Sequence, residues 1–249
     1  MVLLKKALKA FLSLKTAVWL LVLLLAVLFY GSLIVPFRPE FQQLYIMPLF
    51  RWMAGSPFGI TWWLWLSIAV LSLLTVNTII CSIDSVLRKR GARNWLLIIS
   101  PQVAHIGFLF ILLAHLLSSY GSYKGMTYAY EGSVLRLPGG REVLFDRINT
   151  TIDPSGYLTG WSADITYYQN DRAVARDVIR PNSPSFRDGF GLYIRTVRMT
   201  PYTAALVEIS REPGAPFALT GGILFLAGMF SLLMLKARRE ESAASPGLI

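Results

Sequence analysis

The sequence predicts an α-helical integral membrane protein with four transmembrane helices and a β-rich extracytoplasmic domain inserted between helices 3 and 4. Of its 249 residues, 54% are hydrophobic and only 15% are charged. The apolar residues fall into four blocks without Lys, Arg, Asp or Glu, each close to the roughly 20 residues that a membrane span requires. These blocks are Thr16–Val35, Thr61–Ile83, Trp95–Leu117 and Phe217–Leu235.

This pattern divides the chain into three parts. Residues 1–119 form three helices (about 16–35, 61–83 and 95–117) with an outer loop at 36–60, residues 120–216 form the β-rich domain, and residues 217–249 form the fourth helix and a cytoplasmic tail. The first apolar run is longer than a signal-peptide core, and no small-residue cleavage site follows it. In the outer loop we expect a short helix on the membrane surface, and the tryptophans that follow are typical of the membrane interface: Trp62, Trp63 and Trp65.

The formal net charge of +10 is a topology signal. Eleven basic residues flank the spans and fall on one side if the chain crosses four times, which predicts both termini in the cytoplasm. The segment 120–216 holds eleven basic and ten acidic residues, so we expect a lipid bilayer and no nucleic acid as partner. The eleven are Lys5, Lys6, Lys9, Lys15, Arg88, Lys89, Arg90, Arg93, Lys236, Arg238 and Arg239.

The β-rich segment shows alternation and turns typical of hairpins. We predict a hairpin of Val134–Leu137 with Glu142–Phe145, a second of Ser162–Tyr168 with Ala173–Ile179, and two further strands, Gly191–Met199 and Ala204–Ser210. The segment has no histidine or cysteine, and its carboxylates are scattered singly, so we expect them to be solvated and not catalytic.

Cys81 is the only cysteine of the chain, so no disulfide and no Cys-x-x-Cys-His motif for covalent haem attachment can form within it. For Cys81 itself we expect a small, buried apolar role.

The two histidines, His105 and His115, both lie in the third apolar block. An ionisable residue inside a membrane is a functional-site hypothesis, and histidine is a common axial ligand of haem iron. The alternative is that each hydrogen-bonds a neighbouring helix. Ser100 and Pro101 are typical of a helix start, so we expect this helix to begin there, after an interfacial lead-in at 95–99.

Helix geometry separates the two histidines by about 15 Å along the axis and about 80° around it, so they cannot bind one iron together. The other spans hold no histidine, and the methionines of the outer loop and the fourth span are weaker candidates: Met47, Met53, Met229 and Met234. Either a partner subunit supplies a second ligand, or the histidines are structural.

Several short motifs, in order along nearly the whole chain, resemble the ResB (CcsB) family of cytochrome c biogenesis proteins. They include His105-Ile106-Gly107 in the third helix and the passage from that helix to the outer domain. The motifs are Leu14–Val18, Gly31, Pro36, Trp63, Asn77–Cys81, His105–Gly107, Gly121, Gly125, Glu131–Gly132, Glu212–Gly214, Gly221–Gly222 and Gly228.

The resemblance implies a multi-pass protein of the bacterial inner membrane that acts in system II with a CcsA-type subunit. Together they would form a cytochrome c synthetase (a haem lyase) that exports haem and presents it to apocytochrome c. It further implies that His105 is an axial ligand of haem b iron, with the second ligand from the partner, and that this chain is not catalytic alone. For His115 we favour a helix-packing hydrogen bond over a second haem ligand.

Two other classes of function stay open. The chain is alternatively a haem-binding membrane anchor subunit of a respiratory or quinol–cytochrome electron-transfer complex, or a structural assembly factor without haem.

Overall fold

The computed structural model describes residues 13–45, 47–88, 95–138 and 140–244. It divides into two compact units. The helical unit comprises Met1–Leu44, Leu49–Tyr120 and Gly214–Ile249, and the β unit comprises Tyr45–Pro48 and Gly121–Pro213.

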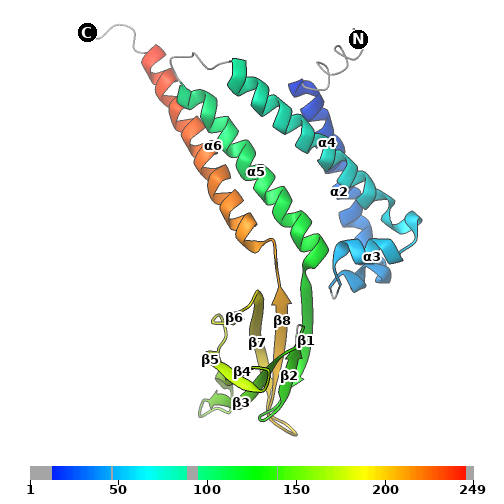
Figure 1. Cartoon of the computed structure of the whole chain (residues 1–249), viewed down its shortest axis with the longest axis vertical. Helices are drawn as coiled ribbons and strands as arrows, with labels where there is room; N and C mark the ends of the chain where they lie inside the picture. The colour runs from blue at the N-terminus through cyan, green and yellow to red at the C-terminus, as the bar shows by residue number, and fades with distance from the viewer. Residues whose placement is uncertain (1–12, 46, 89–94, 139, 245–249) are drawn as a thin grey trace. The chain divides into compact units, whose positions relative to one another are not determined.

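Four helices in the described part of the chain are long and apolar enough to cross a membrane, as predicted. They are α2 (Leu14–Ile34), α4 (Phe58–Arg88), α5 (Trp95–Gly121) and α6 (Ala215–Ala244) (Figure 1). Between α2 and α4 lie two 3-10 helices, η1 (Val35–Phe37) and η2 (Pro39–Tyr45), and the short helix α3 (Leu49–Gly55). The prediction of a short helix in the outer loop is therefore confirmed, whereas its position at a membrane surface stays a prediction.

Helix α5 begins at Trp95 and not at Ser100, so the prediction of a helix start at Ser100-Pro101 is wrong. The Ser100 hydroxyl donates to the carbonyl of Leu96 at 2.7 Å, which places it inside the helix and not at its cap. Pro101 stands in the helix interior. Proline there forgoes one backbone hydrogen bond, a loss that transmembrane helices tolerate when nearby hydroxyls and neighbouring helices compensate.

Helices α2 and α4 pack against each other through a glycine and a tryptophan. A Cβ added to Gly31 would meet the Trp63 ring at 2.6 Å or less, so only glycine admits this ring. Trp63 is accordingly buried, with 7% of its surface exposed, and its ring packs against α2, while its depth in the membrane stays a prediction. Trp62 and Trp65 are exposed and remain compatible with their prediction as interfacial residues.

Helices α5 and α6 approach each other even more closely, and they run side by side in Figure 1. Added side chains on Gly107 or Gly228 would overlap the backbone of the opposite helix. A Cβ on Gly221 would stand 2.7 Å from the carbonyl oxygen of Gly107. Small residues at such contacts are the usual basis of helix packing in membranes, where apolar surface is already satisfied by lipid.

The start of α2, the end of α4, the start of α5 and the end of α6 lie at one end of the helical unit in Figure 1. The predicted basic flanks belong to these helix ends, and Lys15, Lys236 and Arg238 lie in the described part of the chain. Lys5, Lys6, Lys9, Lys89, Arg90 and Arg93 lie outside the described residues.

The β unit consists of two four-stranded antiparallel sheets, with strand orders β1-β8-β7-β6 and β2-β3-β4-β5. Both predicted hairpins are confirmed, since β2 pairs with β3 and β4 with β5. Strands β1 and β6 were not predicted. The strands are β1 (Tyr123–Ala129), β2 (Val134–Leu137), β3 (Arg141–Ile152), β4 (Leu158–Gln169), β5 (Arg172–Ile179), β6 (Ser185–Arg187), β7 (Phe190–Arg198) and β8 (Ala204–Arg211).

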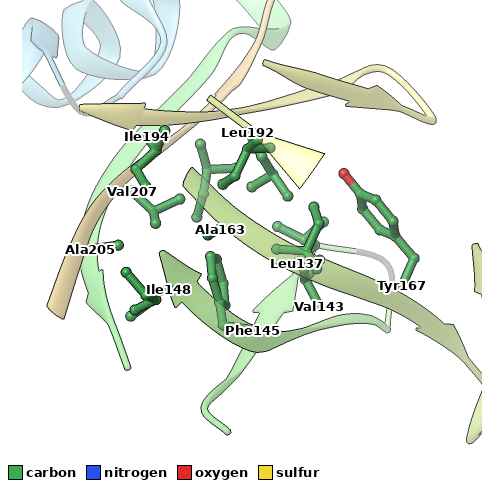
Figure 2. Close-up of a cluster of buried hydrophobic side chains, with 14 of the residues drawn as sticks. Leu137, Val143, Phe145, Ile148, Ala163, Tyr167, Leu192, Ile194, Ala205 and Val207 are labelled. Atoms are coloured by element: carbon green, nitrogen blue, oxygen red, sulfur yellow. The ribbon is translucent and has the colours of Figure 1, made fainter. Parts of the chain in front are cut away.

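One hydrophobic core joins the two sheets, and Figure 2 shows its side chains. Val143, Phe145 and Ile165 from one sheet and Leu192 and Val207 from the other are almost fully buried. The alternation of apolar residues along the strands brings these side chains to one face of each sheet.

Glu208 is an exception to the prediction that the carboxylates of the β unit are solvated, because only 3% of its surface is exposed. Its carboxylate accepts hydrogen bonds from Arg195 Nε at 2.8 Å and forms an ion pair with Lys124 Nζ at 3.2 Å. A buried charge requires such partners. Glu208 therefore ties β1 and β7 to β8 from the face of the sheet opposite the core.

We predict that Gly221→Leu destabilises the helical unit, because its side chain has no space against Gly107 and the backbone of α5. Overpacking at a well-packed contact costs about 1–3 kcal/mol. The measurement is the thermal unfolding temperature of the full chain in detergent, monitored by the loss of monodisperse protein. The control is Gly222→Leu at the adjacent position, where an added Cβ meets nothing within 4 Å. Equal unfolding temperatures for the two variants would contradict the close approach of α5 and α6.

We also predict that the β unit loses stability at high pH through Tyr167. Burial raises the pKa of this phenol above its usual value of about 10, and Asp177 and Asp188 add to the rise, while the Ser185 hydrogen bond and Arg187 oppose it. Since the folded pKa exceeds the unfolded one, the stabilisation is complete below about pH 10 and is lost as the pH rises through the folded pKa.

The measurement is the unfolding temperature of the full chain between pH 8 and pH 11. Tyr167→Phe should flatten the decline, whereas Tyr168→Phe, the neighbouring and more exposed tyrosine, should keep it. An equally steep decline in both variants would assign it to other groups.

Candidate functional site

His105 lies within hydrogen-bond reach of a second helix. Its Nδ1 atom stands 2.9 Å from the hydroxyl oxygen of Ser82, so α5 and α4 are joined by a polar contact inside the helical unit. The imidazole is half-buried, and it lines two separate cavities.

The larger cavity has a volume of about 590 Å³, which lies within the range of roughly 300–1,000 Å³ typical of small-molecule sites. All four long helices contribute to it, and its walls combine two kinds of side chain. The apolar wall includes Leu14 and Leu21 of α2, Leu74 of α4, Phe108 of α5 and Phe225 of α6.

The polar wall of this cavity is a single face of α4, joined by His105 from α5. Asn77, Cys81 and Asp84 follow one another at four and three residues, the spacing that places side chains on one helix face. Cys81 Sγ lies 3.9 Å from Asn77 Oδ1. The prediction of a buried, purely apolar role for Cys81 is therefore wrong, since its half-buried thiol belongs to a polar face.

The smaller cavity has a volume of about 360 Å³ and an apolar lining, with Ser82, Gln102 and His105 as its polar members. The carboxamide oxygen Gln102 Oε1 is buried and has no hydrogen-bond partner. Glu40 Oε2, Trp63 Nε1 and Trp161 Nε1 are further buried polar atoms without a partner in the described part of the chain. Among these atoms, Gln102 Oε1 belongs to a residue that lines a His105 cavity.

His115 has a different environment. Its side chain is exposed, and in the described part of the chain it makes no hydrogen bond and lines neither His105 cavity. The interpretation of His115 as a helix-packing hydrogen bonder is therefore wrong for the described residues. As their spacing predicted, the structure places the two histidines at different positions and not at one site.

In the described ranges, no methionine and no other histidine lines either His105 cavity, whereas Cys81, whose thiolate is another possible ligand for iron, lines the larger one. Met53 is buried against the outer loop, and Met229 and Met234 are exposed on α6. Likewise, no cluster of three or more His, Cys, Asp or Glu residues that could hold a metal ion occurs among the residues described.

Sequence analysis identified His105 but missed Ser82, Gln102 and Asp84. Asp84 directly follows the apolar block that ends at Ile83. The spacing of Asn77, Cys81 and Asp84 is typical of one helix face, so the sequence contains a signal for Asp84. The contact between Ser82 and His105 joins residues 23 positions apart on two helices, so no periodicity reports it.

The β unit has one polar cleft, of about 570 Å³, lined by Asp146, Asp164 and Asp177 together with Arg176 and Arg180. Each carboxylate already accepts a hydrogen bond from a neighbour on the same unit. The donors are Thr166 to Asp146, Asn149 to Asp164 and Ser185 to Asp177. The carboxylates of this cleft are therefore held by neighbouring side chains of the same unit.

Comparison with known protein families gives no match, and no curated protein sequence matches the chain. Among solved structures, the chain is similar to a protein described as "Cytochrome c Heme Lyase CcmF", with 17% identity and a TM-score of 0.45. The similarity covers 86% of this chain and 34% of that one, so the chain spans about a third of that protein's length. Similarity at this level establishes neither a family nor a function.

Fold and site together describe a candidate multi-pass membrane protein with a β-rich unit. It has four candidate membrane helices, a two-sheet β unit between α5 and α6, and an imidazole that lines two cavities in the helical unit. The resemblance to ResB proteins stays a prediction.

Proposed function

We propose that this chain is the haem-handling membrane subunit of a cytochrome c synthetase, in which His105 is an axial ligand of haem b iron. The observation that carries the proposal is the position of His105. His105 lines a cavity to which all four long helices contribute, whereas His115 lines neither His105 cavity. The motifs that resemble ResB proteins include the same residue.

The residues present fit a haem group. The cavity offers a single imidazole donor for iron, large aliphatic and aromatic side chains for the faces of an apolar macrocycle, and polar side chains along one wall. In the smaller cavity, the unpartnered Gln102 Oε1 supplies a hydrogen-bond acceptor on the other side of His105. When bound, haem supplies the iron redox chemistry and the vinyl groups that form thioether bonds with a client's thiols.

The residues of the chain bind and orient. His105 would hold the iron from one side, and Leu74, Phe108 and Phe225 would exclude water and hold the ring. Asn77 and Asp84 would place polar groups at the wall of the cavity formed by α4. We assign the chain binding and orientation of haem and no catalytic step of the attachment itself.

The lining of the cavities supports a partner. Since, in the described part of the chain, no second histidine and no methionine lines the two cavities that His105 lines, the opposite ligand would come from a CcsA-type subunit. His115, exposed on α5, is available to a partner helix and would contact that helix there.

The charge pattern supports the membrane orientation. The basic flanks belong to one end of the helical unit, which would face the cytoplasm of a bacterial inner membrane with both termini. The β unit is inserted between the other ends of α5 and α6, so it would lie outside the cytoplasm, where apocytochrome c is the expected client in this system II proposal.

We predict that His105→Ala lowers the haem content of the full chain at least tenfold when it is purified with its CcsA-type partner. The haem absorbance spectrum per protein is the measurement, and His115→Ala is the matched control because it removes the other histidine. Unchanged haem in His105→Ala would contradict the proposal.

The same strains distinguish the alternative function. In a synthetase, His105→Ala abolishes the maturation of a coexpressed c-type cytochrome. In an anchor subunit of an electron-transfer complex, His105→Ala removes haem while cytochrome c maturation continues, and quinol-dependent electron transfer falls instead.

A further inference from the structure

We propose that Ser82 is a positioning residue that accepts the Nδ1 proton of His105 and thereby presents Nε2 to iron. This inference rests on the proposed function. It concerns the contact of 2.9 Å between Ser82 Oγ and His105 Nδ1, which links α4 to α5 across 23 residues of sequence.

The direction of this hydrogen bond follows from the chemistry of a metal-bound imidazole. A neutral imidazole carries one proton, and a metal requires the lone pair of one nitrogen. Because Ser82 occupies Nδ1, iron binds at Nε2, and the proton is then on Nδ1 and points to the serine oxygen. If Ser82 donated instead, Nε2 would carry the proton and could not bind iron.

The hydroxyl of Ser82 differs from three other hydroxyls of its helix. Ser67, Ser72 and Thr75 of α4 donate to the carbonyl four residues earlier, each at 2.8 Å. This is the usual bond of a serine or threonine inside a helix. In the described part of the chain, Ser82 makes its hydrogen bond to His105 alone.

The surroundings make the contact effective. Ser82, Gln102 and His105 are the polar members of an otherwise apolar cavity, and Ser82 Oγ lies within hydrogen-bond distance of Nδ1. A hydrogen bond from the outer nitrogen fixes the tautomer and ring orientation of a metal-ligating histidine and raises its basicity. Ser82 would therefore strengthen the iron–histidine bond without touching the haem.

The test uses the full chain in detergent, titrated with hemin and then reduced. With only His105 as a ligand, the ferrous haem is five-coordinate, so the iron–histidine stretching band in the resonance Raman spectrum reports the basicity of the imidazole. Ser82→Ala should lower the frequency of this band and weaken hemin binding by about 10–100-fold, the usual effect of removing such a partner.

Ser82→Thr keeps an oxygen and should restore both values. Ser82→Cys, of similar size but with a weak acceptor, should resemble Ser82→Ala and guards against a variant that fails to fold. Ser72→Ala is the matched control, since it removes a hydroxyl of the same helix that bonds only its own backbone.

The outcomes separate the two proposals. If hemin binding is equal in the wild-type chain and His105→Ala, the assignment of His105 is wrong, and the role of Ser82 fails with it. If His105→Ala loses hemin while Ser82→Ala and Ser82→Cys keep the wild-type band and affinity, His105 binds iron without Ser82, and the present inference is overturned.

Discussion

The close approach of α5 to α6 is the constraint on which the rest of the helical unit depends. Gly107 and Gly221 bring the two backbones together, and Gly228 does the same against Ala104 nearer the end of α6. Since these contacts lie on one side of α5, they fix its rotation about its own axis. The rotation then determines where every other side chain of α5 points, including both histidines.

His105 follows directly from this constraint. It stands next to Ala104 and two residues before Gly107, so it lies on the flank of α5 and not on the face that packs against α6. There it meets Ser82 of α4, and the space left beside the tight helix pair forms the two cavities that it lines. A bulkier residue at the glycine contact would change both the packing of α5 against α6 and the position of the His105 side chain.

Much of this architecture could be predicted from the sequence because it depends on patterns within single segments. Four uncharged apolar runs predicted the helices, and alternation around short turns predicted two hairpins. Strand β1 was missed because Lys124, Gly125 and Thr127 interrupt any apolar alternation, and its pairing with β8 joins residues more than 70 positions apart. Local patterns carry no information about such partners.

The candidate site shows the same division. The presence of His105 in a span could be predicted, whereas its contact with Ser82 could not, because it joins two helices. A serine before a proline is typical of a helix start, yet the Ser100 hydroxyl bonds within the helix, so the predicted start was wrong. The burial of Trp63 could not be predicted either, because it depends on Gly31 of another helix, which leaves room for the ring.

The two histidines finally argue for an assembly larger than one chain. His105 has a polar partner on a neighbouring helix, whereas His115, ten residues further along the same helix, is exposed and has none among the described residues. In hydrocarbon, an imidazole nitrogen without a hydrogen bond costs free energy that water would otherwise offset. A partner helix over this side of α5 would remove that cost.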